Sequence, residues 1–307
     1  MCGRMHHIMN KNEHFKSGFV AVVGRPNVGK STLINALIGD KIAIVSDKAQ
    51  TTRNRIICVY TDEAKQIVFM DTPGVHKPKH KLGEFMVDAA IESLKETEAV
   101  LFVVAGNEKR GPGDNFIIEQ LKRVKVPVFL VVNKIDTLQK EQVLEAIVSY
   151  QDAYPFAGVI PISAKNKENL SELLTVLGEH LPEGPQYFPE DMITDQPERL
   201  IISDIVREKI LLSTRDEIPH AIAVDVDEMK TRDDGTTYIR ATIYCERDSQ
   251  KGIIIGNKGA LLRKIGAEAR MDIQKLLATK VYLDLWVKVK KDWRNKSGML
   301  SELGYKK

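Results

Sequence analysis

A nine-residue segment, GRPNVGKST (residues 24–32), constrains this chain more than any other feature. It follows the apolar run at 19–23, which is typical of a buried strand, and leads into a helical pattern at 30–38. All four fixed positions of the phosphate-loop pattern G-x-x-x-x-G-K-[ST] are filled, in the strand-to-helix setting that the pattern requires. The alternative is a chance glycine turn, and the correct flanks argue against it. The segment therefore predicts a phosphate-binding loop.

The chemistry of such a loop assigns roles to its residues. Glycines let successive N–H groups converge on phosphate oxygens, and the helix N-terminus adds partial positive charge. Lys30 is expected to reach the β- and γ-phosphates of a nucleotide, and Ser31 to bind Mg²⁺ through its hydroxyl. The whole segment is expected to line the nucleotide: Gly24, Arg25, Pro26, Asn27, Val28, Gly29, Lys30, Ser31 and Thr32.

Two further motifs indicate which base the nucleotide carries. The sequence NKID (133–136) follows the apolar strand pattern at 127–132, at the strand edge where open α/β sheets bind ligands. The Asp136 carboxylate can accept hydrogen bonds from both N1–H and the exocyclic amine of guanine, a pair that adenine lacks. SAK (163–165) follows the next strand and would offer a backbone N–H to guanine O6. The candidate base-side residues are Asn133, Lys134, Asp136, Ser163, Ala164 and Lys165.

A fourth motif and a polar loop complete the predicted site. DTPG (71–74) ends a strand, so Asp71 is expected in the second coordination shell of Mg²⁺ and Gly74 N–H near the γ-phosphate. Thr72, Pro73 and Val75 are expected beside the same phosphates. The loop DKAQTTRNR (47–55) has adjacent threonines, Thr51 and Thr52, one of which would contact Mg²⁺ and the γ-phosphate in the triphosphate state. Such a loop is a nucleotide-dependent switch.

These motifs together resemble the translation-factor-related GTPases, and GRPNVGKST with QTTR (50–53) is similar to the Era branch in particular. The resemblance implies Thr52, rather than Thr51, as the Mg²⁺ ligand. Val75 stands where small signalling GTPases have a glutamine that orients the attacking water, and valine cannot hydrogen-bond to water. The general base is therefore unassigned. Asn27 has two interpretations: support for a potassium ion, as in potassium-activated relatives, or a structural cap of the turn.

The order of patterns predicts two domains. Strand patterns at 19–23, 56–60, 66–71, 99–104, 127–132 and 158–162 alternate with helical patterns at 30–38, 83–97, 113–123, 139–152 and 168–180. Most strands are continuously apolar, as in a mostly parallel sheet with helices on both faces. The predicted divisions are a flexible leader (1–16), a GTPase domain (17–181), a proline-rich linker (182–198), a second domain (199–296) and a C-terminal tail (297–307).

The second domain has a different pattern and charge. Its elements run α-β-β-α-α-β, and residues 199–307 carry 22 basic against 16 acidic residues, whereas residues 1–198 carry 23 against 26. KGIIIGNKGALLRKIG (251–266) resembles the signature of a type II KH domain, whose GxxG turn approaches single-stranded RNA. The resemblance and local charge indicate these RNA contacts: Lys251, Gly256, Asn257, Lys258, Gly259, Arg263 and Lys264. A basic protein-binding module is the alternative.

A GTPase followed by a KH domain is the Era arrangement. It implies a GTP-hydrolysing protein that binds the 3′ end of small-subunit ribosomal RNA during small-subunit assembly. We expect a cytoplasmic protein, since the three cysteines are scattered and no apolar run could span a membrane. We also expect a monomer. The basic stretch 288–296 also suits weak peripheral contact with anionic lipids, but RNA is the favoured partner because the KH signature lies in the same domain. Trp286 is expected to pack in the core. The open alternatives are a GTP- or GDP-binding RNA scaffold with negligible turnover and a membrane-associated GTPase.

Overall fold

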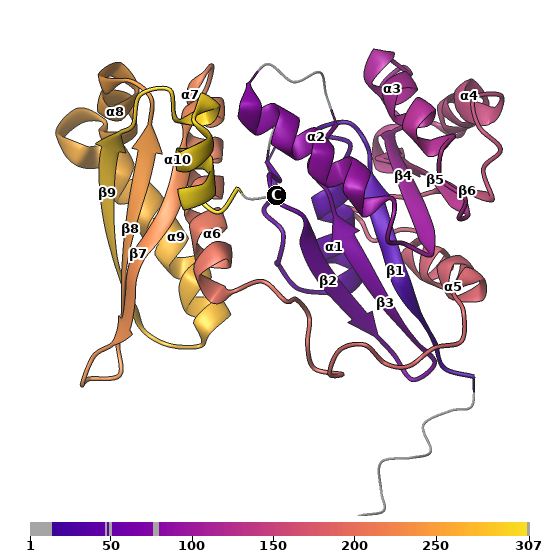
Figure 1. Ribbon diagram of the computed structural model, residues 1–307, viewed down its shortest axis with the longest axis horizontal. Coiled ribbons are helices and arrows are strands. Elements are labelled where there is room, and N and C mark those ends of the chain that lie inside the picture. Colours follow the sequence, from indigo (N-terminus) through magenta and orange to yellow (C-terminus); the bar gives the residue numbers. More distant parts are fainter. Residues whose placement is uncertain (1–13, 47, 49–50, 76–79, 306–307) are drawn as a thin grey trace, which may run out of the picture.

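The computed structural model describes residues 14–46, 48, 51–75 and 80–305, and it has the two predicted domains (Figure 1). The first domain is a six-stranded sheet in the order β2-β3-β1-β4-β5-β6, in which only β2 is antiparallel to its neighbour among the pairs formed. The strands are β1 (Lys16–Val23), β2 (Ile56–Thr61), β3 (Lys65–Asp71), β4 (Ala99–Ala105), β5 (Val128–Asn133) and β6 (Gly158–Pro161).

Helices cover both faces of this sheet, because its central strands are apolar along their whole length. Every residue of β4 and β5 is buried, as expected for strands that are covered on two sides. One core contains side chains of α1 (Lys30–Ile38) and α5 (Leu170–His180). The other core contains residues of α2 (Lys81–Ser93), α3 (Pro112–Leu121) and α4 (Lys140–Gln151). The predicted mostly parallel sheet with helices on both faces is confirmed. The phosphate loop joins β1 to α1.

The segment between the domains lies against the first domain. Ser17 N–H donates to Pro182 O (3.1 Å) and Val59 N–H donates to Ile193 O (2.9 Å), so this segment follows the sheet edge. Strand β1 begins at Lys16, a residue that the sequence analysis places in the flexible leader. Residues 1–13 of that leader lie outside the described residues.

The second domain is a three-stranded sheet with helices packed on one face. Its strands β7 (Ala223–Thr231), β8 (Thr237–Cys245) and β9 (Val281–Val289) pair in that order, antiparallel and then parallel. Side chains of α6 (Glu198–Ser213), α8 (Asp248–Ile255) and α9 (Ala260–Leu277) form its core. In α9 the buried residues Ile265, Ala269 and Ile273 are four apart, which places them on one helix face. The predicted element order is confirmed.

Two features of the second domain differ from expectation. The Trp286 side chain is 54% exposed and its indole N–H donates to Asp284 (2.9 Å), so the prediction of a core role was wrong: its position in the strand directs it to the face without helices. Trp293 is the buried tryptophan, and it donates to Ala221 O (2.9 Å). The predicted tail contains a further helix, α10 (Ser297–Glu302).

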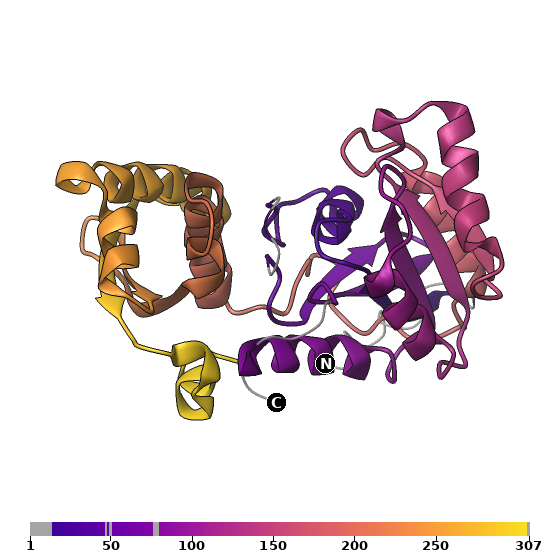
Figure 2. The ribbon, with the colours of Figure 1, turned by 90° about the horizontal axis from the view of Figure 1, so that it is seen from above.

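The C-terminal segment joins the two domains. Leu82 and Met86 of α2 share an apolar cluster with Trp293, Leu300 and Leu303. Figure 2 shows α10 at the end of α2, between the domains. Apolar burial of this kind favours a defined arrangement of the domains. No helix among the described residues has the length and apolar character that crossing a membrane requires.

Candidate functional site

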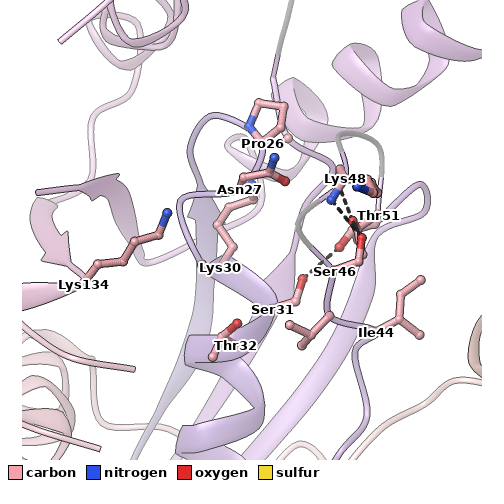
Figure 3. Close-up of a pocket in the computed structure, with 14 residues that line it drawn as sticks. Pro26, Asn27, Lys30, Ser31, Thr32, Ile44, Ser46, Lys48, Thr51 and Lys134 are labelled. Atoms are coloured by element: carbon pink, nitrogen blue, oxygen red, sulfur yellow. Dashed lines mark hydrogen bonds between the residues drawn. The ribbon is translucent and has the colours of Figure 1, made fainter. Parts of the chain in front are cut away.

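A cavity of about 330 Å³ lies over the N-terminus of α1 (Figure 3). It is formed by the phosphate loop, the loop between α1 and β2, the end of β3 and the start of the NKID segment. Its lining residues are Pro26, Asn27, Gly29, Lys30, Ser31, Thr32, Ile44, Val45, Ser46, Lys48, Thr51, Thr52, Gly74 and Lys134. The structure thus brings together residues of the phosphate loop, the polar loop and the DTPG segment with Lys134 of the NKID segment.

Glycine is required where these loops meet. Gly29 has φ 97°, and a Cβ there would lie 2.3 Å from Asn133 Nδ2. A Cβ on Gly74 would lie 2.8 Å from the Pro26 backbone. Both approaches exclude a side chain, because non-bonded heavy atoms do not come that close. Bare backbone at these two positions therefore lets the NKID and DTPG segments pack against the phosphate loop.

Lys30 is held inside this loop. Its Nζ donates to Gly24 O (3.2 Å) and Arg25 O (3.0 Å), and only 6% of the residue is exposed. Burial lowers the pKa of Lys30 to about 8, while the nearby Asp71 opposes this shift. A buried cation beside converging backbone N–H groups suits the β- and γ-phosphates of a nucleotide.

Ser31, Thr52 and Asp71 form a corner beside Lys30. Ser31 Oγ donates to Asp71 Oδ2 (2.9 Å), Thr52 Oγ1 donates to the same oxygen (3.2 Å), and the two hydroxyl oxygens are 2.9 Å apart. Asp71 Oδ1 is buried without a hydrogen-bond partner among the described residues, and burial raises the pKa of Asp71. Two hydroxyls and a carboxylate oxygen available for a ligand fit a hydrated Mg²⁺.

Thr51 takes a different position from its neighbour. Its Oγ1 donates to Lys48 O (2.6 Å) and lies 2.9 Å from Ser46 Oγ, away from the Ser31–Asp71 corner. Of the two adjacent threonines, the structure therefore places Thr52 at the corner.

The base-side residues form a hydrogen-bonded group at the ends of β5 and β6. Asn133 connects three segments: its Nδ2 donates to Val28 O (2.9 Å), and its Oδ1 accepts from the N–H groups of Lys134 (2.8 Å) and Ala164 (3.0 Å). Ser163 Oγ donates to Asp136 Oδ1 (2.7 Å), which orients an exposed carboxylate. Lys134, with φ 69°, is the member of this group that reaches the cavity.

Several predicted residues serve the site through structure rather than by facing the cavity. The Arg25 side chain forms ion pairs with Asp114 (2.9 Å) and Glu108 (3.0 Å), so only the backbone of Arg25 is available to the phosphate loop. Thr72 Oγ1 donates to Val22 O (2.7 Å). Val28 is buried in the core that contains α1 and α5, and Val75 in the core that contains α2, α3 and α4. The Pro73 and Lys165 side chains are not among the cavity lining.

The GNKG turn (residues 256–259) connects α8 to α9 in the second domain. Gly256 (φ 72°), Lys258 (φ 48°) and Gly259 (φ 77°) all have positive φ angles, which makes a tight turn with Asn257 and Lys258 exposed at its tip. Asn257, Lys258, Arg263 and Lys264 are exposed, and Lys251 is half-buried. The turn thus presents cations and accessible backbone to solvent, as binding to an RNA backbone requires.

Sequence reasoning missed two residues that the structure makes prominent. Arg53 belongs to the quoted polar loop but is only 2% exposed, and Glu208 in α6 is equally buried. A charged residue is rarely this buried without partners. No local pattern distinguishes either residue, because both are buried by contact between the domains.

Comparison with known proteins matches both halves of the chain. Residues 19–134 match the family described as 50S ribosome-binding GTPase, and residues 217–294 match the KH domain family. A crystal structure of an Era variant from Aquifex aeolicus bound to GDP·AlF₄⁻ is 43% identical, with a TM-score of 0.92, covering 95% of this chain and 99% of that chain. Era in complex with MgGDPNP and nucleotides 1506–1542 of 16S ribosomal RNA matches with the same values.

Proposed function

Because the chain belongs to the Era family of GTPases, we propose that it is a GTP-hydrolysing switch that binds single-stranded ribosomal RNA in small-subunit assembly. The observation that carries this proposal is the Ser31–Thr52–Asp71 corner next to the buried Lys30. It joins a loop that can change with the nucleotide to the loop that holds the phosphates. The relatives were crystallised with GDP·AlF₄⁻, and with MgGDPNP and 16S rRNA, which are the ligands that this function needs.

The proposed roles at the phosphates follow from the geometry. Ser31 and Thr52 would hold Mg²⁺ through their hydroxyls, and Asp71 would act on it through bound water. The metal, when bound, neutralises charge on the phosphate oxygens. Lys30 adds a fixed positive charge, the N-terminus of α1 supplies N–H donors, and Gly74 offers a backbone N–H to the γ-phosphate. All these groups favour the charge that develops as the phosphoryl group is transferred.

Guanine selection is proposed for Asp136. Its carboxylate is oriented by Ser163 Oγ at 2.7 Å and keeps oxygen lone pairs for N1–H and the exocyclic amine of guanine. Adenine would leave these acceptors unpaired, which disfavours ATP.

The group that positions the attacking water is not Val75, because that side chain is buried in the apolar core. Asn27 lines the cavity and has φ 65°, a conformation that asparagine tolerates better than most residues. We propose that it supports a potassium ion beside the phosphates. The alternative is that it serves only the turn.

RNA binding is proposed for the GNKG turn and its flanking cations. Lys251, Lys258, Arg263 and Lys264 would contact phosphates, and the close backbone approach at Gly256 and Gly259 would admit a single strand. The 3′ end of the small-subunit ribosomal RNA is the proposed target.

We also propose a cytoplasmic monomer with at most weak peripheral membrane contact. Within the basic stretch 288–296, Lys290 pairs with Glu302 (3.1 Å) and Arg294 with Glu246. These ion pairs reduce the positive charge available for anionic lipids.

Multiple-turnover phosphate release from GTP, with and without Mg²⁺ and with and without single-stranded RNA of the 3′-end sequence, tests the function. We expect Mg²⁺-dependent turnover and RNA binding by the same protein. RNA binding with no turnover beyond a single cycle under any of these conditions would favour the scaffold alternative.

A further inference from the structure

The loop between α1 and β2 (residues 39–55), which we call the Thr52 loop, contacts the second domain before and after its threonines. On the first side, Glu208 of α6 accepts hydrogen bonds from Val45 N–H (2.9 Å) and from Lys41 Nζ (2.6 Å). Asp272 of α9 also accepts from Lys41 Nζ (3.0 Å). The Glu208 side chain is only 3% exposed, whereas Lys41 is 45% exposed, so the contact is buried at the Glu208 end and reaches solvent at the Lys41 end.

On the other side, Arg53 enters a socket that the second domain and the C-terminal segment build. Its guanidinium donates to Ile222 O (2.6 Å) and to the Tyr305 hydroxyl (3.3 Å). It also lies 5.7 Å from the centre of the Trp293 ring and 6.0 Å from that of Tyr305. A guanidinium favours both aromatic faces and backbone carbonyls, and it is costly to bury without them. The socket therefore matches an arginine.

Arg53 is the next residue after Thr52, and the two side chains are bound by different domains. Thr52 Oγ1 contacts Ser31 and Asp71 in the GTPase domain, at 2.9 and 3.2 Å. Successive Cα atoms are about 3.8 Å apart across a trans peptide. The two anchors, one in each domain, therefore act on the same short stretch of backbone.

We propose that Arg53 is a positioning residue for the nucleotide site: the second domain, through Arg53 and Glu208, holds Thr52 at the Ser31–Asp71 corner. This inference rests on the proposed function and adds the route by which the RNA-binding domain and the nucleotide act on each other. Docking of the domains favours the triphosphate state, and by linkage the triphosphate state favours docking to the same degree. GDP lacks the γ-phosphate, so its binding depends much less on the position of Thr52.

The apolar contact between α2 and the C-terminal segment supports the same arrangement. Trp293, which faces Arg53, also belongs to the cluster that contains Leu82 and Met86 of α2. Tyr305 packs against this cluster and stacks on Trp293 with ring centres 6.1 Å apart. One aromatic group thus contacts both Arg53, at the end of the Thr52 loop, and α2, the helix that follows the DTPG segment.

Arg53→Met tests the proposal, with Arg55→Met as the matched control. Arg55 lies two residues further along, its side chain is 41% exposed, and among the described residues its ion-pair partner is Glu96 (3.5 Å). The measurement is the Mg²⁺-dependent affinity of the full chain for a non-hydrolysable GTP analogue and for GDP. We expect Arg53→Met to weaken the analogue about tenfold or more, since hydrogen bonds from a charged donor are lost. GDP affinity should change less than twofold, and Arg55→Met should match the parent for both.

Two further variants keep the test decisive. Glu208→Gln retains an acceptor for Val45 N–H but removes the negative charge opposite Lys41. We therefore expect the affinity for the analogue to fall roughly threefold more than the affinity for GDP. It decides the matter if Arg53→Met does not fold. Arg53→Lys keeps the charge without the planar fork and should give an intermediate loss.

Equal losses for analogue and GDP in the Arg53 variant, or behaviour like that of Arg55→Met, would overturn the proposal. A parent protein that binds neither nucleotide would instead contradict the proposed function.

Discussion

The nucleotide cavity and the GNKG turn are the two proposed ligand sites, and both are built on glycine-rich turns at helix N-termini, yet they are built differently. In the cavity, Lys30 and Asp71 are buried, and their neighbours hold them by hydrogen bonds. In the turn, Lys258 and Asn257 are exposed. A buried, prearranged site stabilises one ligand strongly, whereas an exposed basic turn depends on screened charge and backbone access. Substitutions should therefore cost far more at the first site than at the second.

The largest effect is expected at the base. Asp136→Asn exchanges a carboxylate for a carboxamide, which keeps one acceptor oxygen but sets an N–H donor against the exocyclic amine of guanine; the same donor matches the carbonyl that xanthine has at that position. We expect a swing of about 10⁴-fold in the ratio of GTP to xanthosine triphosphate affinity, since two charged hydrogen bonds change. Competition between the two nucleotides for a fluorescent analogue measures it. Unchanged selectivity would mean that NKID does not contact the base.

Lys30→Ala should be next in size. Removal of a buried cation that faces phosphates is expected to weaken GTP about 10²–10³-fold. RNA binding by the second domain should be unchanged in the absence of nucleotide, because Lys30 lies far from the GNKG turn. Lys122→Ala, at an exposed lysine that follows α3 and pairs with Glu119 (2.7 Å), is the control. Hydrolysis at the parent rate by the Lys30 variant would show that the phosphate loop is misassigned.

A smaller effect is expected at the RNA turn. Asn257→Asp with Lys258→Asp leaves the glycines intact and should weaken single-stranded RNA about tenfold at moderate salt, with less loss as salt rises. Lys230→Asp with Thr231→Asp makes the same charge change at the hairpin end of the domain, opposite the turn (Figure 1). Equal losses of RNA affinity in the two double variants would show that RNA binding depends on the overall charge of the domain and not on the GNKG turn. Nucleotide affinity without RNA should stay at the parent value in both.

The smallest effect concerns potassium. If Asn27 supports a monovalent cation, GTP turnover should rise about threefold or more when potassium replaces sodium, as charge stabilisation at the γ-phosphate improves. Asn27→Ala should remove this response while GDP binding persists. Equal rates of the parent in both salts would assign Asn27 to the turn alone.

Local pattern was enough to predict most of the fold and the candidate site. The continuous apolar runs of β4 and β5 and the fixed spacing of the phosphate loop depend on neighbours in sequence, so they were visible before the structure. Long-range contact was not visible. Trp286 alternates like a core residue but faces the uncovered side of its sheet, and no pattern tells which side a helix will cover. Arg53 and Glu208 became significant only when two domains met around them.

The central claim is that the two sites act on each other through the Thr52 loop. The most direct measurement is the affinity of the full chain for single-stranded 3′-end ribosomal RNA at one fixed salt concentration, with GDP and with a non-hydrolysable GTP analogue. Coupling through the Thr52 loop predicts that RNA affinity differs between the GDP and the analogue state. By linkage, RNA must change the ratio of analogue affinity to GDP affinity by the same factor. Identical RNA affinities in both states would contradict it and leave two domains that are merely joined.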